Sequence, residues 1–111
     1  MSKKMPKLPE RVETSGYSIE YYIQSKLEKE LKGYTTSCPF GRIDILTEHY
    51  IIEIKKWEEH KKAIGQILGY GFYYKNHQKR IHFFGPKPSA KVLNSIKEVC
   101  ANFNIEITEE V

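Results

Sequence analysis

Three charged side chains in two adjacent isoleucine-rich segments could do chemistry together: Asp44, Glu53 and Lys55. The segments are Arg-Ile-Asp-Ile-Leu-Thr over 42–47 and Tyr-Ile-Ile-Glu-Ile-Lys over 50–55, and a Glu-His pair separates them. Both segments alternate in the manner of β-strands, so they predict a hairpin. If the Glu-His pair forms its tip, Asp44 lies directly opposite Glu53. Opposed side chains have Cβ atoms roughly 4.5–5.5 Å apart, and like charges at that spacing destabilise a sheet.

Two carboxylates this close need a proton or a cation between them. A hard divalent ion such as Mg²⁺ suits oxygen ligands of this kind. Lys55 projects on the same face, because side chains in a strand alternate with a period of two, and it could reach the ion's water or a phosphate oxygen. The alternative is a solvated face on which diagonal salt bridges join the two acids to Lys55 and Arg42. Leu46 and Ile51 share that face, which favours a partly covered site.

The same register gives the hairpin a second face made only of isoleucine. Ile43 would lie opposite Ile54, and Ile45 opposite Ile52. A one-residue slip would mix these side chains with the charged ones, so the apolar face supports the register.

Helices and strands are expected on both sides of this hairpin. Apolar residues recur every three or four positions in the helical segments, with Gly33 as the stop of the first helix and Ser89 as the cap of the third. Helices are expected over 17–31, about 57–74 and about 89–103, and strands over 33–38, 42–47, 50–55, 79–84 and 104–108.

These elements predict a single α/β domain, a three-layer-like sandwich in which helices flank a mixed central sheet. The expected order is α-β-β-β-α-β-α-β, and its final strand-helix-strand unit implies a parallel crossover. Residues 1–14 are basic and contain prolines, so they are expected to form a flexible arm that precedes the domain over 15–111.

The motifs Gly41-Arg-Ile-Asp44, Ile52-Glu53-Ile-Lys55 and Gln66-x-x-x-Tyr70 resemble the PD-(D/E)XK nuclease superfamily. They are most similar to recombination-type exonuclease domains that carry a Gln-x-x-x-Tyr motif. The resemblance covers about residues 19–84 and implies a restriction-endonuclease-like core. The sequence departs from the usual pattern in one place, because Ile43 stands where the family usually has proline.

The resemblance implies a metal-dependent nuclease that hydrolyses DNA phosphodiester bonds with Mg²⁺, or Mn²⁺ as a substitute. Asp44, Glu53 and the carbonyl of Ile54 would be metal ligands, and Lys55 would assist the attacking water. Many members add a glutamate from the first helix, here Glu20.

Two further assignments stay open at this point. Glu28 is the rival for the first-helix glutamate, and an ordinary helix glutamate is the plain alternative for Glu20. Gln66 would orient the Lys55 region or a nucleotide, and Tyr70 would contact a phosphate or a base. Both could instead be buried polar groups that satisfy the local backbone.

Basic and aromatic residues near this site suggest contacts with nucleic acid. Arg42, Lys56 and Lys62 could bind phosphates, and Trp57 could stack on an unpaired base. The chain has 18 basic and 14 acidic residues, a net charge of +4 that permits a polyanionic partner such as DNA. The alternative function is a non-catalytic nucleic-acid-binding module with the same fold.

Composition limits the remaining classes. The hydrophobic share of 40% supports a folded core, and no apolar run approaches the ~20 residues of a membrane-spanning helix. The N-terminus lacks a secretory signal, and Cys38 and Cys100 are expected to be reduced packing residues. We therefore expect a cytoplasmic or other reducing intracellular location and no membrane contact. A homodimer or an accessory protein is a further expectation from the family resemblance.

Overall fold

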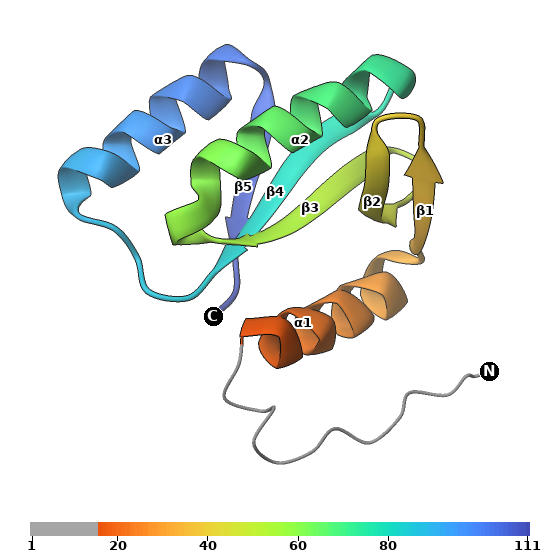
Figure 1. The fold of residues 1–111 in the computed structure, drawn as a ribbon, viewed down its shortest axis with the longest axis horizontal. Coiled ribbons are helices and arrows are strands. Elements are labelled where there is room, and N and C mark those ends of the chain that lie inside the picture. Colours follow the sequence, from red (N-terminus) through yellow and green to blue (C-terminus); the bar gives the residue numbers. More distant parts are fainter. Residues whose placement is uncertain (1–15) are drawn as a thin grey trace.

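A five-stranded sheet with helices on both faces forms the protein in the computed structural model, which describes residues 16–111 (Figure 1). The elements are α1 (Gly16–Leu31), β1 (Tyr34–Cys38), β2 (Gly41–Leu46), β3 (Tyr50–Lys56), the 3₁₀ turn η2 (Trp57–Glu59), α2 (His60–Tyr73), β4 (Gln78–Phe84), α3 (Ala90–Asn102) and β5 (Ile105–Glu109). The expected second helix therefore begins as a 3₁₀ turn and ends one residue earlier.

The strands lie in sequence order, β1-β2-β3-β4-β5. The first three pair antiparallel through tight connections, whereas β3, β4 and β5 pair parallel through helical crossovers. The predicted α/β class, the mixed sheet and the parallel crossover are confirmed.

Each face of the sheet has its own apolar core. Helix α1 covers one face, where Ile23 packs with Ile45, Ile52 and Ile54. Helices α2 and α3 cover the other face, where a larger cluster includes Trp57 and Phe83. The three layers are visible in Figure 1, with α1 apart from the other two helices.

The β2–β3 hairpin has the expected register, because Ile45 pairs with Ile52 and Leu46 with Ile51. Strand β1 adds a feature that the hairpin alone does not reveal. Its register against β2 shifts between Tyr34, opposite Leu46, and Thr36, opposite Ile43. Two residues of β2 thus stand opposite one residue of β1, which is a β-bulge.

The bulge reverses the side-chain alternation of β2. Ile43 packs in the α2–α3 core, whereas Ile45 packs under α1. The expectation of one continuous isoleucine face is therefore wrong at Ile43, since a bulge inserts a residue that breaks the period of two.

The end of α1 also differs from expectation. Lys32 takes the left-handed conformation, with φ 57°, and the Gly33 amide bonds to the Glu28 carbonyl at 3.0 Å. Gly33 is instead required for space, because a Cβ there would lie 2.5 Å from Ile45 Cγ2. At α3 the predicted cap is confirmed, since Ser89 accepts a hydrogen bond from the Val92 amide at 3.3 Å.

Three further expectations concern the two cysteines, membrane-spanning helices and the N-terminal arm. Cys38 and Cys100 are free thiols, and burial raises the pKa of Cys100. In the part of the chain that the structure describes, no helix has the length and apolar character needed to cross a membrane. The predicted arm over 1–14 lies outside the described residues.

Candidate functional site

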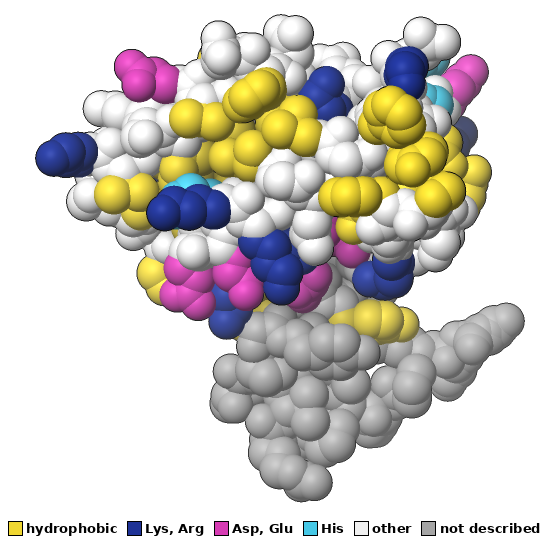
Figure 2. Space-filling view, turned by 45° about the horizontal axis from the view of Figure 1, so that its top comes forward, with side chains coloured by type: hydrophobic (Ala, Val, Ile, Leu, Met, Phe, Trp, Pro, Cys, Tyr) yellow, Lys and Arg dark blue, Asp and Glu magenta, His cyan; other side chains and the backbone are white. Residues whose placement is uncertain are grey.

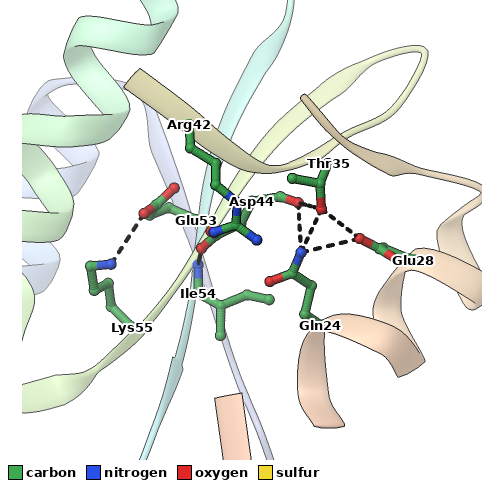
Figure 3. Close-up of polar contacts among 8 residues, drawn as sticks. All are labelled: Gln24, Glu28, Thr35, Arg42, Asp44, Glu53, Ile54 and Lys55. Carbon is green, nitrogen blue, oxygen red and sulfur yellow. Dashed lines mark hydrogen bonds and ion pairs between the residues drawn. The ribbon is translucent and has the colours of Figure 1, made fainter. Parts of the chain in front are cut away.

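Asp44 and Glu53 are both buried, with 3% and 2% of their surfaces exposed, at the point where the β2–β3 ladder ends. Oδ2 of Asp44 accepts a hydrogen bond from the Ile54 amide at 2.9 Å, so the carboxylate takes the place of a backbone acceptor. Figure 3 shows Asp44 between Arg42 and Ile54, with Glu53 directed toward Lys55. The structure therefore brings both acids to the same end of the β2–β3 ladder.

Each acid pairs with a cation of its own strand. Lys55 Nζ lies 3.2 Å from Glu53 Oε2, and Arg42 Nη1 lies 3.3 Å from Asp44 Oδ1 (Figure 3). The diagonal ion pairs of the alternative interpretation are not the ones formed. Oε1 of Glu53 is buried and has no hydrogen-bond partner among the described residues.

Burial and mutual repulsion keep a proton in this pair. Burial, with Asp44 as the second cause, raises the pKa of Glu53 to about 8. Burial also raises the pKa of Asp44, although the Ile54 amide and Lys55 oppose that change. Burial would lower the pKa of Lys55, but the charges of Glu53 and Asp44 outweigh it and raise that pKa. At neutral pH one proton thus relieves the repulsion.

Of the two first-helix glutamates, Glu20 is the one that approaches the acids. Burial and the charge of Asp44 raise the pKa of Glu20, which shows that it lies within their field. Glu28 instead accepts hydrogen bonds from Gln24 at 3.1 Å and Thr35 at 2.8 Å.

Gln24 and Thr35 contact Asp44, and neither of them was predicted from the sequence. Gln24 Nε2 donates a hydrogen bond to the carbonyl oxygen of Asp44 at 3.2 Å (Figure 3). Thr35 Oγ1 also lies 3.0 Å from that oxygen, and its single hydroxyl proton can go either to this carbonyl or to Glu28. The bulge perturbs the β1–β2 ladder at this carbonyl, so side chains supply its partners. A signal was present in the sequence: Gln24 is a polar residue inside the apolar stripe of α1, beside Ile23.

Gln66 and Tyr70 lie on α2, on the opposite side of the sheet from α1. Burial first, then Glu53 and Asp44, raise the pKa of Tyr70 to about 12, so its hydroxyl lies within the field of the acids. Tyr70 is nearly fully buried, and its hydroxyl also approaches Gly41. Within residues 16–111, Oε1 of Gln66 is buried without a hydrogen-bond partner.

The residues predicted to contact nucleic acid are divided between surface and core. Arg42 and Lys62 are exposed and Lys56 is half-buried. Trp57 is 3% exposed and stacks on Phe83 with ring centroids 4.2 Å apart. Its predicted role as a platform for a base is wrong, because the ring fills the α2–α3 core.

No group of three His, Cys, Asp or Glu residues in the described part of the chain could hold a metal ion. The backbone group of Ile54 that contacts the acids is its amide, a donor, and the predicted use of its carbonyl as a ligand has no such contact to support it. Mg²⁺ or Mn²⁺ binding between Asp44 and Glu53 stays a prediction.

Comparison with known proteins gives relatives of one kind. The chain is similar to three KilA-N domain-containing proteins of Acanthamoeba polyphaga mimivirus. Two are 39% identical over 89 residues, which is 79% of this chain and 24% and 35% of theirs. The third is 36% identical over 87 residues, 78% of this chain and 24% of its own. The chain thus spans between a quarter and about a third of these relatives.

No family model matches the sequence, and no solved structure matches it. The relatives carry the name of a family other than the PD-(D/E)XK nucleases, so the resemblance to those nucleases is wrong. The expectation of a metal-dependent nuclease that hydrolyses DNA is corrected with it. A short Asp and Glu-x-Lys pattern needs only one hairpin with alternating charges, which many sequences can form.

Proposed function

We propose that this chain is a non-catalytic DNA-binding module that contacts unpaired bases. The observation that carries the proposal is a pair of solvent-facing phenyl rings, Phe40 and Phe72, which are 56% and 62% exposed. Exposed phenyl rings lose the hydrophobic contribution of burial, so a surface that presents two of them is typical of a binding site.

The two rings come from distant parts of the sequence, and both belong to the surface around α2. Phe40 lies in the β1–β2 turn, and its ring packs directly on Gly69 of α2. Phe72 follows Gly69 by three residues, and side chains three apart on a helix are neighbours. Phe40 also contacts the buried Tyr70 edge-on, with centroids 5.9 Å apart, which fixes its ring on the helix.

A cation lies over the Phe72 ring, and another is near Phe40 in the sequence. Lys75 Nζ is 3.8 Å from the centroid of Phe72, and the exposed Arg42 follows Phe40 by two residues. Stacking on aromatic rings next to basic side chains is the way proteins bind single strands without strict sequence preference. The net charge of +4 favours a polyanion over a neutral ligand.

A DNA partner also agrees with the KilA-N name of the relatives. Within this proposal Asp44 has a structural role, in which it accepts the Ile54 amide at the end of the β2–β3 ladder and pairs with Arg42, while Glu53 pairs with Lys55. A divalent ion bound to the two acids would strengthen the same frame, and the unpartnered Glu53 Oε1 supports that addition.

The test is fluorescence anisotropy with a labelled single strand and the matching duplex over a range of salt concentrations. We expect binding that prefers the single strand and weakens as salt rises. Phe40→Ala and Phe72→Ala should each weaken it about tenfold, since base–aromatic stacking contributes ~1–3 kcal/mol per base.

Phe103→Ala is the matched control, because Phe103 is a 44% exposed phenylalanine at the end of α3. It should leave the affinity unchanged. Equal losses in all three variants, or no measurable binding by the wild-type protein, would remove the proposal.

A further inference from the structure

A second surface lies between α2 and α3, and it is lined by aliphatic and basic side chains instead of the phenyl rings of Phe40 and Phe72. It is a groove of about 610 Å³ lined by His60, Lys61 and Ile64 from α2 and by Lys91, Val92, Ser95, Ile96 and Val99 from α3. Figure 2 shows hydrophobic side chains gathered over these two helices, with basic side chains beside them. We call these eight residues the α2–α3 groove.

The groove exists because the two helices pack on different strands. Helix α2 lies on β3 and β4, whereas α3 lies on β5. Ile96 is buried at its base, while Val92 and Val99 are each 38% exposed on its wall. Ser95 is small and exposed at the centre, which leaves the depth between the helices unfilled.

The charges at the groove have one sign. Lys61 and Lys91 are exposed cations from the two opposite walls. No carboxylate is among the described residues that line it. An occupant must therefore offer an apolar ridge to the floor and negative charge to both walls.

We infer that the α2–α3 groove binds an acidic amphipathic helix of a partner protein. Such a helix presents apolar side chains at i, i+3 or i+4 and i+7 along one stripe and carboxylates beside it. The stripe would cover Val92 and Val99, and the carboxylates would meet Lys61 and Lys91. Charge on both walls would set the orientation and the association rate, and the apolar floor would supply most of the affinity.

Charge complementarity disfavours the other occupants. A second copy of this chain carries +4 and would bring like charge to a basic groove. Residues 1–15 hold Lys3, Lys4, Lys7 and Arg11 against two glutamates, so that segment is basic as well. DNA matches the lysines but has no apolar ridge for the valines.

The probe is a fluorescein-labelled peptide of about 14 residues, roughly four helical turns, with leucine along one stripe and glutamate elsewhere. Two control peptides replace either every glutamate by lysine or every leucine by serine. We expect the leucine–glutamate peptide to bind the wild-type chain at least about tenfold more tightly than either control.

Two pairs of variants locate the contact. The double variant Lys61→Glu with Lys91→Glu should abolish the preference for the acidic peptide. Lys29→Glu with Lys62→Glu changes the net charge equally outside the groove and should retain it. Ser95→Phe should fill the groove and weaken binding about tenfold, whereas Asn94→Phe, an exposed neighbour that does not line it, should not.

Four results would overturn the inference. They are equal binding of the acidic and basic peptides, an unchanged affinity in Ser95→Phe, displacement of the peptide by single-stranded DNA, and a self-association in ultracentrifugation that Ser95→Phe abolishes. Circular dichroism of each variant checks that the fold is intact. The peptide comparison, the Ser95→Phe affinity and the ultracentrifugation result do not depend on the DNA-binding proposal.

Discussion

Asp44 accepts a hydrogen bond from the main-chain amide of Ile54, 2.9 Å away, where the ladder between β2 and β3 ends. One carboxylate oxygen therefore continues the hydrogen bonding beyond the last β2–β3 pair, and the other pairs with Arg42. Asp44 therefore has a structural role in the hairpin. This relationship gives the buried Asp44 carboxylate a structural reason to be present that does not require catalysis.

We expect Asp44→Ala to lower the free energy of unfolding by about 1–3 kcal/mol, because the buried Ile54 amide loses its acceptor. Asp44→Asn keeps an oxygen at the same place and should cost less. Urea denaturation followed by circular dichroism measures both. Equal losses in the two variants would show that charge, and not the hydrogen bond, is what Asp44 supplies.

Glu53 should make stability fall as pH rises. Its pKa is raised from 4.5 to about 8 in the folded state, so between those values the folded chain binds a proton that the unfolded chain does not. The loss should approach at most about 1.4 kcal/mol per pH unit in that window. Denaturation midpoints measured from pH 4 to pH 9 test it.

Glu53→Gln should flatten that pH dependence and leave a chain more stable than the wild type near pH 8. Glu98→Gln, on an exposed α3 carboxylate, is the control and should keep the wild-type slope. A wild-type slope in Glu53→Gln would show that this carboxyl does not hold the proton.

A divalent ion would substitute for that proton. If Mg²⁺ or Mn²⁺ binds Asp44 and Glu53, the melting temperature at pH 7 should rise with ion concentration in the millimolar range. The rise should vanish in Glu53→Gln, which cannot supply the second negative charge. If neither ion changes the melting temperature, neither binds between Asp44 and Glu53, and the pair holds only a proton.

Local patterns predicted the hairpin well, since a two-residue tip and alternating isoleucines leave one register for Ile45 and Ile52. The bulge at Asp44 depends on how β1 pairs, and on Gln24 and Thr35 as partners for the perturbed carbonyl. These are contacts between segments distant in sequence, and hydrophobic periodicity carries no information about them.

The same limit applies to the aromatic residues. Trp57 follows a lysine pair and precedes a glutamate pair, so its neighbours in the sequence are polar. It nevertheless stacks on Phe83, because the 3₁₀ turn η2 directs its side chain into the core. Phe40 lies in a turn, where sequence alone suggests no partner, and it meets α2 only because Gly69 leaves room for its ring. The resemblance to PD-(D/E)XK nucleases is wrong for a related reason. Two acids on neighbouring strands, such as Asp44 and Glu53, do not determine which residues surround them.

Gly69→Ala tests the aromatic surface without removing either ring. A Cβ at Gly69 would lie 2.1 Å from Phe40 Cε2, so the exposed Phe40 ring must leave its place on α2. We expect affinity for single-stranded DNA to fall about fivefold or more, in the range of a lost stacking contact. Alanine favours a helix over glycine by about 1 kcal/mol, so the loss of affinity should not be accompanied by a comparable loss of stability.

Gly65→Ala is the matched control on the same helix, because no atom lies within 4 Å of its added Cβ. It should share any gain in melting temperature and keep the wild-type affinity. If both variants bind equally well, the position of Phe40 over α2 is irrelevant to DNA, and the site must lie elsewhere on the chain.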